Sequence, residues 1–186
     1  MSGFDVAASH SGYLPVGAST VEAIVRIRGP RIDAPGVDVA LRLWTPRGAS
    51  VAVLREIAPA TGDLRGTAVA LDDLTVQYGA DRWTGGSREY ELAVAVPPRA
   101  AGDELLAARL AVVAGGVVVG RALIAVMCID DAAVAAAELP TGPSPPPRRP
   151  LAGEPACDGP CPGCGARPAD GDRFCEACGR DLVAGP

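Results

Sequence analysis

Four cysteines near the C-terminal end are the residues of this chain best suited to chemistry. Cys161 pairs with Cys164 and Cys175 with Cys178, each as Cys-x-x-Cys, with ten residues between the two pairs. Two such pairs can place four thiolates around one tetrahedral ion, and Zn²⁺ is the usual occupant of an all-sulfur, four-coordinate site. The spacing therefore predicts one structural Zn²⁺ held by all four cysteines.

The residues around the cysteines fit the same interpretation. Gly165 and Gly179 follow the second cysteine of each pair. Glycine lets the chain curl back so that backbone N–H groups can point at the sulfurs. Segment 157–183 resembles a short zinc ribbon of the pattern Cys-Pro-x-Cys-Gly followed by Phe-Cys-x-x-Cys-Gly. Pro162 and Phe174 occupy the proline and phenylalanine positions of this pattern. Four thiolates leave no open metal position, so the ribbon favours a structural or protein-binding role over catalysis.

The remaining cysteines and the other reactive residues do not form a catalytic set. Cys157 begins the ribbon segment, with three residues between it and the pair of Cys161, and is interpreted as a spare, flexible thiol. Cys128 ends an apolar run and is expected to be a small buried hydrophobe, which is the commonest fate of a lone cysteine. The single histidine, His10, is far from both in sequence. No Ser-His-Asp set or phosphate-binding glycine loop is found, so we predict that the chain is not an enzyme.

Charge and the N-terminal sequence bear on partners and compartment. The formal net charge is -5, and a tetrathiolate zinc site adds further negative charge, which disfavours nucleic acid as a partner. The first residues, Met1-Ser-Gly-Phe-Asp-Val, have neither a basic start nor an apolar run, so no signal peptide is expected. Metal-bound thiols then predict a reducing, cytoplasmic location.

Residues 4–130 alternate between apolar and polar in short runs. The clearest run is 20–28, where Val21, Ala23, Val25 and Ile27 share one face, and a second covers 37–43. Further runs are expected at 51–54, 71–78 and 90–96, with Gly- or Pro-containing turns between them. Period-two patterning describes strands that bury one face. We predict an all-β fold, an antiparallel, Ig-like β-sandwich.

The apolar stretch 105–129 is interpreted as two strands rather than a membrane span. Arg109 and Arg121 interrupt it, whereas a helix needs about 20 apolar residues to cross a bilayer. Ala114-Gly115-Gly116 lies midway, where a hairpin would turn. No membrane association is predicted.

Between the sandwich and the ribbon, 131–156 is predicted to be a linker. The alanine-rich segment 130–139, at the junction with the sandwich, is expected to form a short helix, and 140–156 is rich in proline and therefore extended. A spacer is the favoured role, with Arg148-Arg149 as an alternative recognition site. We expect this linker to keep the sandwich and the ribbon separate, so that Cys164→Ser unfolds the ribbon and leaves the melting of the sandwich unchanged.

Two pieces of the chain resemble a bacterial protein family built around a von Willebrand factor A domain. Phe4–Arg28 resembles the segment before that domain and Leu41–Asp131 the segment after it. The landmarks are Gly12-Tyr13-Leu14-Pro15, Thr45-Pro46-Arg47-Gly48-Ala49, Ser87-Arg88-Glu89-Tyr90 and Asp103-Glu104-Leu105-Leu106-Ala107-Ala108-Arg109. The A domain and its Asp-x-Ser-x-Ser metal loop are missing from this sequence. The resemblance therefore implies a host sandwich without its inserted domain.

These features predict a non-catalytic, zinc-binding scaffold or adaptor that binds protein partners in the bacterial cytoplasm. One alternative is a nucleic-acid-associated factor that binds through the ribbon. Another is a zinc-stabilised remnant without independent activity. The identity of the partner and the oligomeric state are left open by the sequence.

Overall fold

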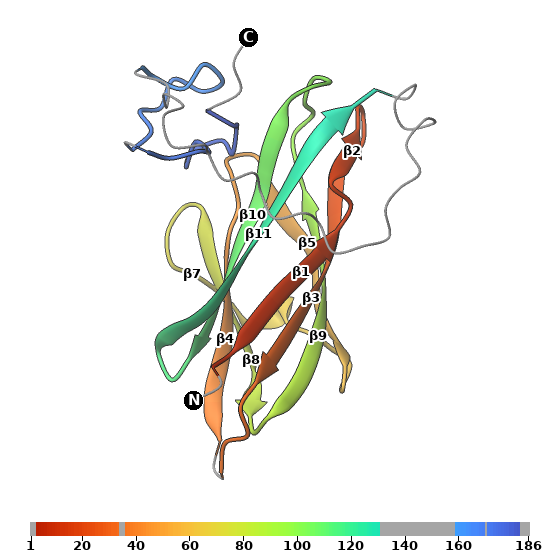
Figure 1. The fold of residues 1–186 in the computed structure, drawn as a ribbon, viewed down its shortest axis with the longest axis vertical. Helices are drawn as coiled ribbons and strands as arrows, with labels where there is room; N and C mark the ends of the chain where they lie inside the picture. Colours follow the sequence, from red (N-terminus) through yellow and green to blue (C-terminus); the bar gives the residue numbers. More distant parts are fainter. Residues whose placement is uncertain (1–2, 34–35, 131–158, 170, 183–186) are drawn as a thin grey trace.

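The structure, a computed structural model, describes residues 3–33, 36–130, 159–169 and 171–182. Two sheets pack face to face, and the cysteine-rich segment lies at one end of them, coloured blue in Figure 1. Within these ranges there is no α-helix, only the short 3-10 turn η1 (Arg65–Thr67). The predicted all-β, Ig-like sandwich is confirmed.

Each sheet has its own strand order. One sheet runs β1-β3-β9-β5-β6 and the other β2-β11-β10-β4-β8-β7. The first contains β1 (Asp5–His10), β3 (Thr20–Gly29), β9 (Gly86–Ala95), β5 (Ser50–Ala58) and β6 (Gly62–Asp63). The second contains β2 (Tyr13–Pro15), β11 (Val117–Ile129), β10 (Glu104–Ala114), β4 (Val37–Trp44), β8 (Thr75–Trp83) and β7 (Ala68–Ala70).

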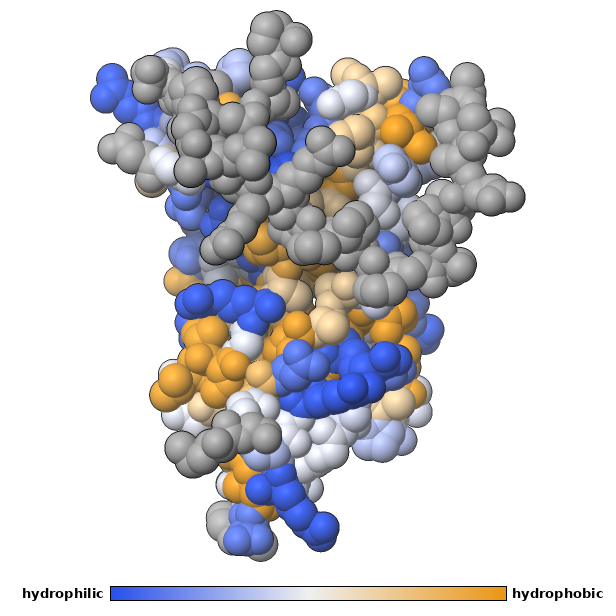
Figure 2. Space-filling model, in the orientation of Figure 1, coloured by the Kyte–Doolittle hydropathy of each residue, from blue (hydrophilic) through white to orange (hydrophobic). Residues whose placement is uncertain are grey.

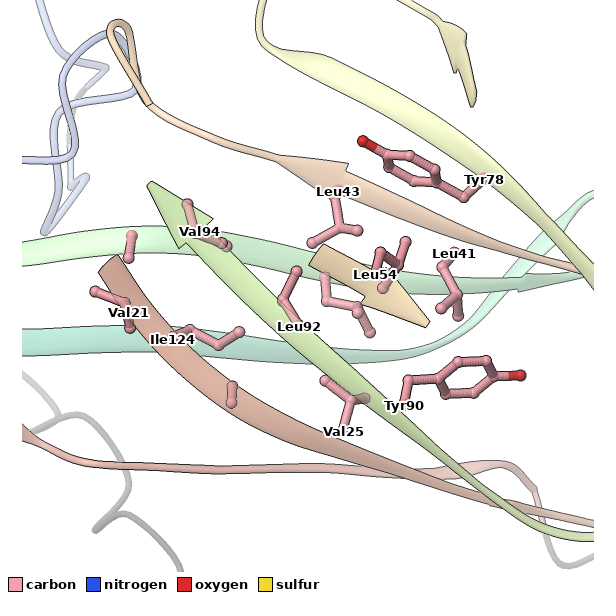
Figure 3. Close-up of a cluster of buried hydrophobic side chains, with 14 of the residues drawn as sticks. Val21, Val25, Leu41, Leu43, Leu54, Tyr78, Tyr90, Leu92, Val94 and Ile124 are labelled. Atoms are coloured by element: carbon pink, nitrogen blue, oxygen red, sulfur yellow. The ribbon is translucent and has the colours of Figure 1, made fainter. Parts of the chain in front are cut away.

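The core forms between the sheets because the alternating strands bury one face each. In β3 every second residue from Val21 to Ile27 is buried, as the pattern predicts. Leu41 and Leu43 of β4 meet Leu92 of β9 from the other sheet, and Figure 3 shows these side chains directed between the sheets. Burial of this apolar surface is the main stabilising contribution to the sandwich.

The stretch 105–129 is the predicted hairpin. β10 and β11 pair antiparallel along most of their length, and the turn uses Gly115 and Gly116 at φ +57° and +83°. A two-residue turn with positive φ at both positions matches the twist of the strands and favours glycine. Cys128 is buried in the core, as predicted. In the described part of the chain, no helix is long and apolar enough to cross a membrane.

The N-terminal strands and the strand near 71–78 differ from the predictions. β1 and β2 were not predicted, because Ala7, Ala8 and Ser9 give no clear alternation. β2 pairs with β11 in parallel, so the sandwich is not purely antiparallel. Residues 71–74 form a turn and β8 begins only at Thr75. The linker 131–156 and Cys157 lie outside the described residues. So does the predicted helix at 130–139, of which only Asp130 is described.

Candidate metal centre

The four predicted ligands come together at one point. The sulfur atoms of Cys161, Cys164, Cys175 and Cys178 all lie within 4.8 Å of one another. Cys161 Sγ is 3.7 Å from Cys178 Sγ, and Cys164 Sγ is 3.6 Å from Cys175 Sγ. These separations exclude disulfide bonds, which are about 2.05 Å long. They match a tetrahedron of sulfurs about 2.3 Å from a central zinc, whose edges are about 3.8 Å.

Both Cys-x-x-Cys pairs adopt the same backbone turn. The N–H of Gly165 donates to the carbonyl of Cys161, and the N–H of Gly179 donates to that of Cys175, each at 2.8 Å. Gly165 and Gly179 have the same φ of +73°, a conformation in which a side chain is strained. We call 161–165 the first knuckle and 175–179 the second knuckle. Their identical geometry explains why glycine follows each pair.

Backbone donors and burial set the protonation of the thiols. Burial tends to raise the pKa of Cys161, but the N–H groups of Gly163 and Cys164 and the neighbouring thiols lower that pKa to about 7. Burial raises the pKa of Cys178 to about 12 and also raises the pKa of Cys175. Backbone N–H groups therefore point at the sulfur of Cys161, the first cysteine of its pair, as predicted.

Little apart from the cysteines fills the interior of the ribbon. Cys161, Cys175 and Cys178 are buried together with Leu182, whereas Cys164 is exposed. Phe174 is buried too, and the guanidinium of Arg173 lies 4.9 Å from the centre of its ring. So small an apolar core cannot hold a fold by itself, and a shared metal ion is the usual substitute.

The donor set fits a metal of zinc type. Four soft sulfur donors at tetrahedral spacing suit Zn²⁺, and they would fill its whole coordination sphere. Such an ion would contribute folding energy and leave no position for a substrate or an activated water.

The second knuckle lies against the sandwich, which differs from the expectation of two separate parts. Residues 179–181 run antiparallel to the start of β10, with a bridge between Leu105 and Arg180. The N–H of Leu106 donates to the carbonyl of Gly179 at 2.8 Å, and the N–H of Asp181 donates to that of Glu104 at 3.2 Å. The ribbon is thus joined to the edge of the second sheet by an isolated β-bridge.

Ion pairs cross the same contact. Arg173 donates to both carboxylate oxygens of Glu104 at 2.8 Å and to Asp181 at 3.2 Å. Arg180 pairs with Asp103 at 3.1 Å. Burial raises the pKa of Glu104, and the neighbouring Asp181 adds to this effect while Arg173 opposes it. Removing the arginine would leave two carboxylates close together and partly desolvated.

This contact could hardly be predicted from the sequence. Glu104 and Arg173 are 69 positions apart, and the arginines of the ribbon alternate with acidic residues in a way that suggests only a balanced, solvated surface. The acidic pair Asp103-Glu104 at the start of an apolar strand was the available signal. Its meaning depends on which segment the fold brings beside it.

The similar proteins that the comparisons found are solved structures. No family model and no curated protein matches this chain. Among solved structures, a von Willebrand factor type A protein from Catenulispora acidiphila is 34% identical, with a TM-score of 0.49, over 53% of this chain. This chain spans 24% of that protein's length.

Two further solved structures are similar at lower identity. The major pilin subunit of Bacillus cereus is 12% identical with a TM-score of 0.46, over 68% of this chain and 40% of its own. A cohesin module from Clostridium perfringens is 11% identical with a TM-score of 0.44, over 70% of this chain and 100% of its own.

Proposed function

We propose that this chain is a non-catalytic zinc protein that acts as a scaffold or adaptor for protein–protein interactions in the bacterial cytoplasm. The observation that carries the proposal is the closed cluster of four cysteines, held in two matching knuckles and docked on a β-sandwich. Four thiolates would take all the positions of a tetrahedral ion, which supports a structural role for that ion. Reduced metal-binding thiols support a cytoplasmic location.

Two of the three arginines of the ribbon, Arg173 and Arg180, support a protein partner over a nucleic acid. Nucleic-acid-binding ribbons usually present a free basic surface to phosphates. Here Arg173 is engaged by Glu104 and Asp181, and Arg180 by Asp103. With these charges neutralised inside the molecule and a formal net charge of -5, phosphate binding has little electrostatic support.

Exposed apolar side chains on β2 and β11 offer a surface for a protein partner. Leu123 and Met127 lie on the same side of β11 and are each 40% exposed, and Tyr13, which pairs with Met127, is 39% exposed. Neighbouring exposed apolar side chains can form part of a contact surface when they belong to a larger patch. Figure 2 shows apolar residues gathered in patches between charged ones on one face of the molecule.

Affinity capture from a bacterial lysate tests the proposal. The double variant Leu123→Ser, Met127→Ser should lose the bound protein, whereas Val69→Ser, which changes another exposed apolar residue at 58% exposure, should keep it. Capture should persist at high salt, because apolar contacts are not screened. Capture that disappears with salt or nuclease would favour the nucleic-acid alternative and contradict the proposal.

A further inference from the structure

The first residues of β10 have an open backbone edge that β4 does not cover. β4 pairs with β10 only between Arg109 and Ala114, although β11 pairs with β10 from Glu104 onward. The start of β10 is therefore flanked on only one side by a strand of the sandwich. Gly179 and Asp181 of the ribbon make the backbone hydrogen bonds on this stretch. An exposed strand edge of this kind is a template for pairing with another chain.

The sandwich holds the second knuckle through three successive carbonyl groups. The N–H of Arg47 donates to Ala177, the guanidinium of Arg99 donates to Cys178, and the N–H of Leu106 donates to Gly179, each at 2.8 Å. Three neighbouring carbonyls can point at three such donors only while the knuckle keeps its curled shape. The second knuckle begins at Cys175, and Cys178 is its next-to-last residue. Both cysteines are candidate metal ligands.

Gly179 also fits the sandwich sterically, whereas its counterpart Gly165 does not touch it. A Cβ atom at Gly179 would lie 2.5 Å from the carbonyl oxygen of Leu106 and 3.0 Å from a methyl group of Leu105. At Gly165, which has the same φ of +73°, a Cβ would meet nothing within 4 Å. The backbone strain of a substitution is therefore equal at the two positions, and only the docking contact differs.

We propose that the ribbon is a zinc-dependent cap on the open edge of β10. Loaded with metal, the second knuckle holds its carbonyls in place and closes the edge. Without metal the knuckle loses its shape, the ribbon leaves, and the backbone groups of Glu104 and Leu106 become available to an extended segment of another protein. The inference rests on the proposed zinc site and adds control of a strand edge to it.

Amide hydrogen exchange measured by NMR on the full chain tests this cap. In the zinc-loaded protein the amides of Arg47 and Leu106 should be protected, and chelation should speed their exchange by about 100-fold or more. The amide of Leu92, in the central strand β9, should stay protected in both states. If chelation left exchange at Arg47 and Leu106 unchanged, the cap would be overturned. Loss of protection at Leu92 would also overturn it, because the ribbon could then not leave without unfolding the sandwich.

A pair of variants separates docking from metal binding. Gly179→Ala should keep zinc, seen by native mass spectrometry, but lose protection at Arg47 and Leu106, whereas Gly165→Ala should keep both. Equal loss in the two variants would contradict a docking role specific to the second knuckle. If the wild-type chain binds no zinc, the proposed function fails together with the cap. If it binds zinc while chelation leaves the edge closed, only the cap fails.

Discussion

The sandwich and the ribbon are stabilised in different ways. The sandwich buries large side chains completely between its sheets, including Trp83, Tyr90 and Leu92. The ribbon buries three of its cysteines, Leu182 and Phe174. Apolar burial can hold the sandwich without a metal, whereas we propose that the ribbon depends on metal binding, which is worth about 10–16 kcal/mol in comparable peptides. From this difference we expect that removing metal unfolds the ribbon and leaves the sandwich folded.

Loss of a metal ligand should have the largest effect on the difference in stability between the ribbon and the sandwich. Cys175→Ser removes one of four donors, so we expect the chain to lose its zinc and the ribbon its fold, with the core of the sandwich intact. Native mass spectrometry and circular dichroism during heating would measure the two effects. Cys128→Ser is the matched control, because Cys128 is buried in the sandwich core. Cys128→Ser should keep zinc and have a lower melting temperature. Loss of zinc from Cys128→Ser together with retention of zinc by Cys175→Ser would contradict the assignment of the ligands.

A cavity in the core should destabilise the sandwich and leave zinc binding unchanged, which is the opposite of losing a metal ligand. Leu92 is fully buried, so Leu92→Ala should destabilise the sandwich by about 2–5 kcal/mol through lost burial and an unfilled cavity. Chemical denaturation of the chelated protein would measure this loss. The zinc stoichiometry of the folded variant should stay at one. A variant that loses its zinc while still folded would show that the metal site depends on the packing of the core.

Breaking the buried ion pairs should weaken docking without removing the metal. Arg173→Ala leaves Glu104 and Asp181 without their shared partner, and we expect a loss of about 2–3 kcal/mol. Amide exchange at Leu106 would report this change.

An exposed pair across the same contact supplies the control. Glu176 pairs with Arg109 at 2.9 Å and its side chain is 64% exposed. Glu176→Gln should change docking by at most about 1 kcal/mol, because exposed ion pairs contribute little. Equal effects of Arg173→Ala and Glu176→Gln would show that burial does not determine the strength of these pairs.

The smallest expected effect concerns a buried carboxylate in the sandwich. Burial raises the pKa of Glu56, while Arg88 and the N–H of Ala60 oppose the rise. An acid with a raised folded-state pKa stabilises the fold below its unfolded pKa, near 4.5, and loses that contribution as pH rises through the folded value. Glu56→Gln should therefore raise the melting temperature slightly at pH 7 and lose this advantage at pH 4. A variant less stable than wild type at pH 7 would show that the pairing with Arg88 outweighs burial.

The sequence predicted those features that depend on local patterns. Alternation identified β3 and β4, the paired glycines identified the β10–β11 turn, and cysteine spacing identified the four thiols that meet. Each of these signals is contained in a short stretch, where side-chain direction follows directly from the backbone period.

The features that were missed depend on partners distant in sequence. β2 consists of only Tyr13–Pro15 and becomes a strand because β11 lies beside it. The pairing of Gly179 with Leu106 likewise depends on where β4 stops covering β10. Neither segment carries a pattern that would identify its neighbour, so only the folded structure could place them.

X-ray absorption at the zinc edge, measured on the purified full chain, tests the central claim most directly. The account predicts one zinc per chain with four sulfur neighbours at about 2.3 Å. A protein without zinc, or a zinc ion with nitrogen or oxygen in its first shell, would contradict it.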